Sequence, residues 1–269
     1  MKKYIVLLII LFFQLSVIGQ EKEITIISWN IQDFGRTKNE QEIEAIANIV
    51  RDSDIIAIQE VVAGFGGAQA VAQLADELNR KGAKWDYVIS NPTKSPKYVV
   101  ERYAFIWKNK HIKIKNRGSL ITELAPVVDR EPFKMDFYFN DKKITILNYH
   151  SRPHNKNPEA EIKPILNYIV KNIKNPVLLA GDFNTKSDNE VFSDFKNSGF
   201  KTSLKNIKTT LKRKCKNDNY LNYAIDNIFL SKHFSKIEAK TIDFVKYCDN
   251  LENARKLSDH LPVYLRVGI

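Results

Sequence analysis

Two apolar runs of strand length each carry a polar cluster at one end. The run 177–180 leads into Gly181-Asp182-Phe183-Asn184, and the run 263–267 follows Ser258-Asp259-His260. Short runs that are largely apolar, such as these, predict buried strands. Carboxylates, an amide and an imidazole at such strand ends add nothing to a core. They are instead groups that hold a divalent metal ion and move a proton, as phosphoester hydrolysis requires.

Apolar spacing along the rest of the chain predicts alternating strands and helices. Helical spacing predicts helices over residues 40–51 and 68–80. Short apolar runs predict further strands at residues 24–29, 55–58, 87–89, 103–107 and 224–230, and a hairpin of 133–139 with 143–149 around Asn140-Asp141. Buried strands that alternate with amphipathic helices predict an α/β protein with central strands and outer helices.

Three later segments depend on individual residues. Pro164 interrupts a helical pattern, which predicts an irregular start at residue 159 and a helix from about Lys163. Asp188 is the predicted N-cap of a short helix that ends at Gly199. The segment 201–220 is polar and rich in lysine with little periodicity, so we expect a loop or exposed turn there.

The first twenty residues differ from the rest of the chain. Lys2 and Lys3 precede an apolar run over residues 4–18, and Gly19 precedes a charged segment. This order predicts a signal peptide over residues 1–19 and a protein that is secreted or periplasmic. A membrane anchor is the rival interpretation, but the run is short for a bilayer and meets no basic stop.

The remaining residues, 24–269, contain no linker rich in proline, glycine or serine, so we predict a single domain. The formal net charge of the chain is +11, which favours a polyanionic partner or an anionic membrane surface but is weak evidence alone. The two cysteines are Cys215 and Cys248. The sequence leaves open whether they are bonded to each other.

Five short motifs follow one another in an order that resembles the endonuclease/exonuclease/phosphatase superfamily. Each motif stands at a predicted strand, and the resemblance covers about residues 24–269. The motifs are Trp29-Asn30-Ile31-Gln32, Ile58-Gln59-Glu60-Val61, Gly181-Asp182-Phe183-Asn184, Ile225-Asp226-Asn227-Ile228 and Ser258-Asp259-His260-Leu261-Pro262. The resemblance implies a four-layer α/β/β/α sandwich, in which two mainly antiparallel sheets pack together between outer helices.

Three further strings narrow the resemblance to the pancreatic-type deoxyribonuclease branch. They are Glu101-Arg102-Tyr103, Arg130-Glu131-Pro132 and Asn148-Tyr149-His150-Ser151. The resemblance implies two catalytic dyads, Glu101 with His150 and Asp226 with His260. These dyads are expected to flank the scissile phosphate, one helping to activate water and the other helping to protonate the leaving 3′ oxygen.

The same residue types indicate a metal site. Glu60 ends an otherwise apolar strand, where an unpaired charge is costly unless it meets a cation. Glu60, Asn30 and Asp259 are the predicted ligands of Mg²⁺ or Mn²⁺, and Asp182 either joins them or orients the attacking water. Ca²⁺ is a further candidate ion.

Other polar residues are expected to contact the substrate. Arg130 offers a guanidinium fork to the phosphate, Asn184 offers an amide donor, and Asn30 and Arg102 complete the predicted contacts. Two positions depart from the branch, because relatives commonly place a minor-groove Arg and Tyr where this chain has Val62 and Val99. Lys94, Lys97 and Tyr98 are the candidate substitutes from the adjacent loop.

These observations favour a secreted, metal-dependent endonuclease that cleaves DNA with little sequence preference. Single-stranded nucleic acid is a second expected partner, and we expect a monomer without stable membrane association after processing. A phospholipid or sphingomyelin phosphodiesterase on the same fold is the first alternative, disfavoured by Glu101 and Arg130 and by the lack of an apolar membrane loop. A non-enzymatic nucleic-acid-binding or toxin-like module is the second, and binding alone would not need the carboxylates and both histidines.

Overall fold

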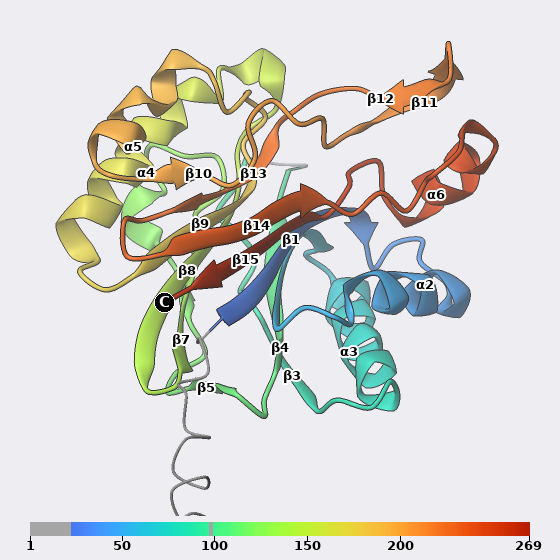
Figure 1. The fold of residues 1–269 in the computed structure, drawn as a ribbon, viewed down its shortest axis with the longest axis horizontal. Helices are drawn as coiled ribbons and strands as arrows, with labels where there is room; N and C mark the ends of the chain where they lie inside the picture. Colours follow the sequence, from blue (N-terminus) through green and yellow to red (C-terminus); the bar gives the residue numbers. More distant parts are fainter. Residues whose placement is uncertain (1–22, 97–98) are drawn as a thin grey trace, which may run out of the picture.

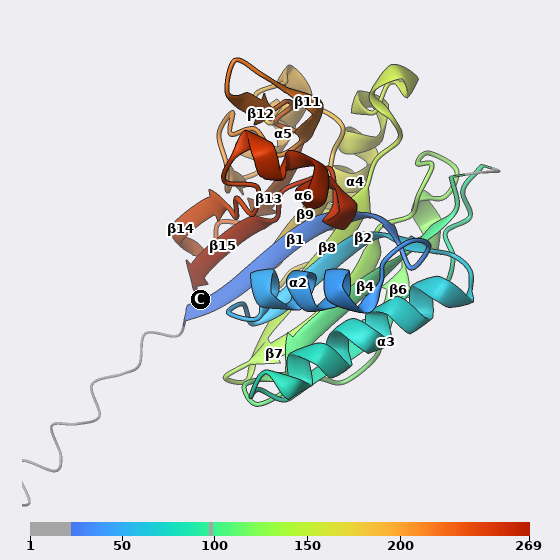
Figure 2. The ribbon, with the colours of Figure 1, turned by 90° about the vertical axis from the view of Figure 1, so that its right-hand side faces the viewer.

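The computed structural model describes residues 23–96 and 99–269. The predicted signal peptide and the predicted contacts Lys97 and Tyr98 lie outside these residues. In the described part of the chain, the strands form two main sheets that pack face to face, and helices cover both outer faces (Figures 1 and 2). The predicted α/β/β/α sandwich is therefore confirmed.

The first main sheet has the strand order β14-β15-β1-β2-β4-β3. Its strands are β1 (Glu23–Phe34), β2 (Ile55–Val62), β3 (Trp85–Ile89), β4 (Glu101–Lys108), β14 (Ser235–Thr241) and β15 (Val263–Gly268). Helices α2 (Glu40–Val50) and α3 (Phe65–Arg80) cover its outer face, where Ile46 and Leu74 are fully buried.

The second main sheet has the order β10-β13-β9-β8-β7-β5, and β6 also pairs with β7. Its strands are β5 (Ile112–Ile114), β6 (Ser119–Leu120), β7 (Phe133–Phe139), β8 (Lys142–His150), β9 (Val177–Asp182), β10 (Lys201–Thr202) and β13 (Asp226–Leu230). Helices α4 (Glu159–Asn172) and α5 (Ser193–Asn197) cover its outer face. The shorter 3₁₀ turns are η1 (Thr122–Leu124), η2 (His154–Lys156), η3 (Glu190–Phe192) and η4 (Cys248–Asn250).

A core of aromatic and branched side chains joins the inner faces of the two sheets. Phe105 of β4 meets Phe137 of β7 edge to face, with ring centroids 5.4 Å apart, and Trp107 meets the same ring at 5.7 Å. Each large apolar side chain buried in this way contributes about 1.5–3 kcal/mol. The sheets are thus held at a fixed spacing, and side chains at their shared edge keep a fixed separation.

Two parallel strand pairs lie at the centre of the sandwich. β1 pairs with β2 in one sheet, β8 pairs with β9 in the other, and the remaining pairings of the main sheets are antiparallel. The carboxyl ends of parallel neighbours reach the same edge of a sheet. Asn30, Glu60, His150 and Asp182 stand at or near these ends, so the packing of the two pairs gathers them at one edge of the molecule.

Two predicted helix starts are wrong. Helix α4 begins at Glu159 and continues through Pro164. Proline there removes one N–H, whose acceptor would be the Ala160 carbonyl, and the buried side chains of Ile165 and Ile169 outweigh that loss. Asn189 caps the next helical segment in place of Asp188, because its side chain accepts from the backbone N–H of Val191 at 3.0 Å.

The predicted loop at 201–220 is also partly wrong. It contains β10 and a two-stranded hairpin, β11 (Leu211–Lys216) with β12 (Asn219–Leu221), which lies outside the main sheets. Its few apolar side chains, Leu211, Cys215, Tyr220 and Leu221, do not alternate regularly with the polar ones, so periodicity does not detect the two strands. Helix α6 (Leu251–Leu257), which was not predicted, packs beside the hairpin.

A disulfide joins this hairpin to η4. Cys215 and Cys248 are bonded, with Cα atoms 5.7 Å apart, which decides between the two states that the sequence left open. The hairpin of β7 and β8 forms as predicted, and Asn140 and Asp141 both have positive φ, as a tight turn of this kind requires. Among the described residues, no helix has the length and apolar character needed to span a bilayer.

Candidate active site

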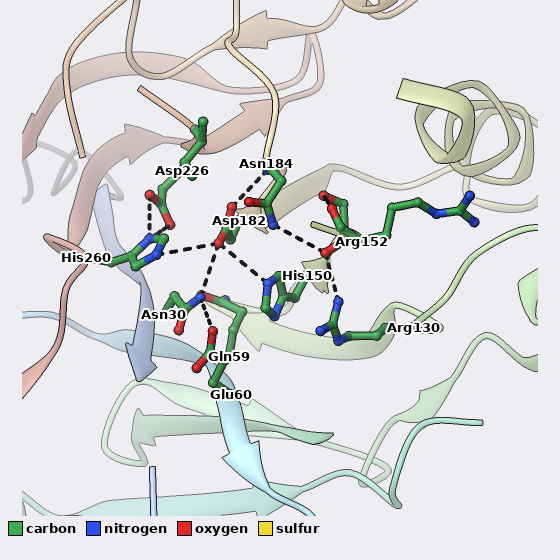
Figure 3. Close-up of polar contacts among 12 residues, drawn as sticks. Asn30, Gln59, Glu60, Arg130, His150, Arg152, Asp182, Asn184, Asp226 and His260 are labelled. Carbon is green, nitrogen blue, oxygen red and sulfur yellow. Dashed lines mark hydrogen bonds and ion pairs between the residues drawn. The ribbon is translucent and has the colours of Figure 1, made fainter. Parts of the chain in front are cut away.

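Two histidine side chains, each paired with a carboxylate, approach the Asp182 carboxylate, and Figure 3 shows the imidazoles of His150 and His260 on opposite sides of it. His150 Nδ1 lies 3.0 Å from Glu101 Oε2, and His260 Nδ1 lies 2.9 Å from Asp226 Oδ2. Their Nε2 atoms face the same oxygen, Asp182 Oδ2, at 3.6 Å and 3.8 Å respectively. The structure therefore brings together both predicted dyads and places Asp182 between them.

Neighbouring strands of the second sheet place three of these residues in one row. In register, His150 of β8 is the partner of Asp182 of β9, and Asp182 is the partner of Asp226 of β13. Gly181 permits this close row, because a Cβ at that position would lie 1.7 Å from the Tyr149 carbonyl oxygen. The Gly-Asp motif therefore reflects both a backbone contact and a functional side chain.

The first sheet contributes Asn30 and Glu60 from the facing side. Glu60 has φ of +59°, at the point where the pairing of β2 shifts register on both sides. A left-handed conformation costs a non-glycine residue on the order of 1–3 kcal/mol. At Glu60 this conformation coincides with the irregularity in β2. The Glu60 carboxylate there accepts a hydrogen bond from the Asn30 amide instead of entering the core.

Asn30 links the two sheets through its amide. Its Nδ2 donates to Glu60 Oε1 at 2.9 Å and to Asp182 Oδ2 at 3.2 Å. Its Oδ1 is buried and finds no hydrogen-bond partner among residues 23–96 and 99–269. An unpartnered amide oxygen beside two carboxylates suits a hard divalent cation, which prefers oxygen ligands.

Asp259 stands near this oxygen-rich position. Its Oδ1 lies 4.0 Å from His260 Nε2, and its Oδ2 lies 3.7 Å from Arg255 Nη2. Asp182, Asp226 and His260 also offer ligand atoms within 4.8 Å of one another. Asp226 is engaged by His260 and Thr209, whereas Asp182 shares the Asn30 amide with Glu60, which places Asp182 rather than Asp226 with the predicted ligands Glu60, Asn30 and Asp259.

Both histidines have raised pKa values. Burial lowers the pKa of His260, but the charges of Asp226 and Asp182 raise it more, so the net shift is well upward. Burial likewise lowers the pKa of His150 and Glu101 raises it, while the nearby Arg130 charge lowers it, with a smaller net rise. Burial raises the pKa of Asp226 to about 6, although the charge of His260 acts to lower it.

Arg130 joins the first dyad. Its Nε lies 3.0 Å from Glu101 Oε2, and its Nη1 donates to the Ser151 carbonyl at 2.9 Å. The same carbonyl accepts from Asn184 Nδ2 at 3.4 Å, and Asn184 donates its backbone N–H to Asp182 Oδ1 at 2.9 Å. The predicted phosphate donors Arg130 and Asn184 therefore lie on the side of the site where His150 lies.

Arg102 lies elsewhere. Its guanidinium donates to the carbonyls of Ala63 at 2.9 Å and Ser90 at 2.8 Å. Along β4 successive side chains alternate between faces, so Arg102 and Glu101 point in opposite directions. No contact joins Arg102 to the cluster in the described part of the chain, and its guanidinium ties two loops together.

Sequence reasoning missed several residues that support the site. Thr209 Oγ1 donates to Asp226 Oδ2 at 2.6 Å and is fully buried. Glu161, also fully buried, accepts from the Tyr149 hydroxyl at 2.6 Å and from the backbone N–H of Arg152 at 2.9 Å, next to the site carbonyl of Ser151. An acid on the apolar face of α4 was the signal for Glu161, whereas nothing local marks Thr209.

Lys38 is a further missed residue. Burial lowers its pKa, and the charges of Glu42, Asp33, Asp259 and Glu60 raise it by less. Two of these acids, Asp259 and Glu60, are predicted metal ligands.

Hollows lie on both sides of the cluster. One of about 530 Å³ is lined by Asn184, Lys186, Tyr223 and Ile225, among others. Another of about 230 Å³ is lined by residues that include Glu60, Val62, Glu101 and Arg130. A substrate that extends in both directions from the phosphate position is therefore accommodated.

The fold and the site together define a metal-assisted phosphoester hydrolase. The sequence model of the endonuclease/exonuclease/phosphatase family matches residues 27–260. The chain belongs to that family, whose members are hydrolytic phosphoesterases that typically depend on a divalent metal. No curated protein sequence matches the chain at a significant level.

Solved structures of low sequence identity share the fold. A family protein from Leptotrichia buccalis is 19% identical with a TM-score of 0.64, over 91% of this chain and all of its own. Humanized D. rerio TDP2 is 16% identical with a TM-score of 0.64, over 92% of this chain and 100% of that one. A mannosyl-6-phosphatase from Bacteroides thetaiotaomicron is 16% identical with a TM-score of 0.63, over 91% and 100%.

Proposed function

We propose that the protein is a secreted, divalent-metal-dependent endonuclease that hydrolyses DNA with little sequence preference. The observation that carries this proposal is the convergence of two histidines on Asp182 Oδ2, at 3.6 and 3.8 Å, each backed by its own carboxylate. Cleavage of a diester needs one group to take a proton from water and another to give a proton to the leaving oxygen. Two separately supported imidazoles on opposite sides of one position meet that need.

The residues of the chain divide the chemistry between them. Glu60, Asn30, Asp259 and Asp182 would hold a Mg²⁺ or Mn²⁺ ion, which supplies charge neutralisation at the phosphate when bound. Asp182, which lies within 4 Å of both imidazoles, orients the water. Asn184 and Arg130 donate to the phosphate oxygens, on which negative charge grows in the transition state.

The substrate assignment rests on charge. The chain carries 42 basic against 31 acidic residues, and a nucleic acid backbone is the polyanion that such an excess favours. Val62 and Val99 line the hollow beside Glu60 and Arg130, which favours contacts to phosphates over contacts that read the bases. DNA is the proposed substrate, with single-stranded nucleic acid accepted as well.

The experiment is a plasmid-nicking assay with Glu60→Gln. We expect this variant to lose turnover in Mg²⁺ and Mn²⁺ yet to bind DNA as the parent does, because only the metal site is weakened. Glu44→Gln, a substitution of an exposed acid on α2, is the matched control and should nick at the parent rate. Chelator should abolish nicking by the parent.

The same assay distinguishes the lipid alternative. Sphingomyelin and RNA are offered to the parent beside plasmid DNA. Robust sphingomyelin hydrolysis without DNA nicking would falsify the nuclease proposal and favour the lipid phosphodiesterase.

Export is proposed on the N-terminal pattern of Lys2, Lys3, the apolar run and Gly19. The exported protein should begin at Gln20 or Glu21. N-terminal sequencing of secreted material decides, and recovery of Met1 would contradict the proposal.

A further inference from the structure

The β11–β12 hairpin carries an unpaired group of cations outside the site. Lys212, Arg213, Lys214 and Lys216 all lie in β11, where Lys212 is partly buried and the other three are exposed. None of the four forms an ion pair with any residue that the structure describes. Figure 1 shows the hairpin extending beyond the two sheets, close to α6. Like charges held on one short element repel each other, so this arrangement favours an anionic partner.

The hairpin is anchored to the body by covalent and polar contacts. Cys215 is bonded to Cys248 of η4, and the Tyr220 hydroxyl donates to the Asp243 carboxylate. Arg255 Nη1 donates to the Leu211 carbonyl at 3.1 Å. The cations therefore cannot spread apart as they would on a flexible loop, and their combined field has a fixed position.

The base of the hairpin is hydrogen-bonded to the segment between α6 and β15 that carries His260. The backbone N–H of Leu211 donates to the Asp259 carbonyl at 2.8 Å, and that of Leu261 donates to the Thr209 carbonyl at 2.6 Å. His260 lies between these two bonds and forms an isolated bridge with Thr210. The basic strand thus starts beside the catalytic histidine and leads away from it.

We propose that this hairpin binds the phosphates of a nucleic acid strand beyond the scissile bond. The inference rests on the proposed nuclease function and specifies where the substrate runs. From Leu211 to Lys216 the strand extends about 17 Å, at about 3.3 Å per residue. In duplex DNA that length corresponds to about five base pairs, at about 3.4 Å for each phosphate of one strand. The hairpin therefore reaches several phosphates on one side of the cut.

The tip of the hairpin favours nucleic acid over a membrane surface. Its turn is formed by Asn217 and Asp218, which both have positive φ, so the most distant point carries an amide and a carboxylate. The described residues 211–221 include no exposed large apolar side chain that could enter the headgroup region. A surface that binds lipid needs such an apolar element in addition to its charge.

The test compares two variants that lose the same charge. One carries K212Q, R213Q, K214Q and K216Q in the hairpin. The control carries K110Q, K113Q, K142Q and K171Q, which replace exposed lysines where β8 and β5 begin and where α4 ends. Because His150 stands at the other end of β8, three of the control positions lie at the opposite end of the sheets.

Binding of a fluorescent 30-base-pair duplex in chelator is measured as a function of salt. Each phosphate contact contributes about 0.9 to the slope of log affinity against log salt concentration. For the hairpin variant we expect the magnitude of this slope to be smaller than in the parent by about 2–4, and the affinity at low salt to be at least about tenfold weaker. For the control variant the slope should change by less than 1. Equal losses in the two variants would overturn the proposal.

Two further measurements separate the possible failures. Hydrolysis of a small diester, bis(p-nitrophenyl) phosphate, should be unchanged in the hairpin variant, and a loss there would show damage to the site instead. A parent that binds DNA through the hairpin but does not nick it would contradict the nuclease function and leave the hairpin assignment standing. Binding of the parent to phosphatidylserine vesicles through the hairpin, with duplex binding unaffected, would overturn the nucleic acid assignment.

Discussion

The two dyads face the same oxygen of Asp182 but are supported differently. His150 relies on Glu101, and Glu101 is shared with the guanidinium of Arg130 at 3.0 Å. His260 relies on Asp226, whose other donor is the neutral hydroxyl of Thr209.

The difference decides how firmly each imidazole holds its proton. A carboxylate shared with a second cation stabilises an imidazolium less than an unshared one. The pKa of His260 is accordingly raised well above its usual value, and that of His150 is raised less. The imidazoles of His150 and His260 thus have similar geometry but differently raised pKa values, which suits an acid and a base that act on one phosphate.

The largest expected effect comes from removing either imidazole. His150→Ala and His260→Ala should each reduce plasmid nicking by at least about a hundredfold, the usual contribution of a positioned acid or base. His233→Ala, at an exposed position, is the control and should leave the rate unchanged.

Circular dichroism establishes that each variant is folded. If one of the two folded variants nicked plasmid at near the parent rate, the site would work with a single dyad and the comparison would fail.

A smaller effect is expected at Thr209, which supports only the second dyad. Thr209→Val keeps the shape but removes the donor to Asp226, and a hydrogen bond to a charged group contributes about 1.5–3 kcal/mol. We expect kcat to fall about tenfold, since about 1.4 kcal/mol corresponds to a factor of ten. Thr209→Ser should keep most of the activity, because it retains the hydroxyl.

A double-variant cycle separates positioning from general damage. Thr209→Val should cost little in a His260→Ala background, where the dyad is already absent, but about tenfold in a His150→Ala background. Equal losses in both backgrounds would show that Thr209 acts on the fold rather than on His260.

The contrast between the dyads also shows what the sequence can predict. His150 and Asp182 end apolar strands and His260 precedes one, so each is visible as a polar exception beside an apolar run. Register brings His150 and Asp182 together within one sheet, and the packing of the two sheets brings His260 to them. The predicted fold and the two pairings required no information beyond these local patterns and the family resemblance.

The supporting residues could not be predicted in the same way. Thr209 reaches Asp226 across 17 positions from a polar segment whose strands show no periodicity, and threonine is common in such segments. Arg102 was instead predicted wrongly. Because it follows Glu101 directly in the sequence, it was expected to contact the substrate. Alternation along β4 turns its side chain to the other face, where it binds two carbonyls.

The smallest and most specific effect is expected at Arg130. The charge of Arg130 lowers the pKa of His150, so Arg130→Gln should raise that pKa further. Glu101 would then have the His150 imidazolium as its only cationic partner, as Asp226 has His260.

Titration of the histidine ring signals by NMR, in chelator, measures both pKa values in one sample. His260 serves as the internal reference and should titrate nearly as in the parent, because its raised pKa is set mainly by burial and by the charges of Asp226 and Asp182. A fall or no change in the pKa of His150 would mean that Arg130 does not set the difference between the dyads. A rise that brings the pKa values of the two histidines closer together would show that the sharing of Glu101 with Arg130 accounts for the difference between the dyads.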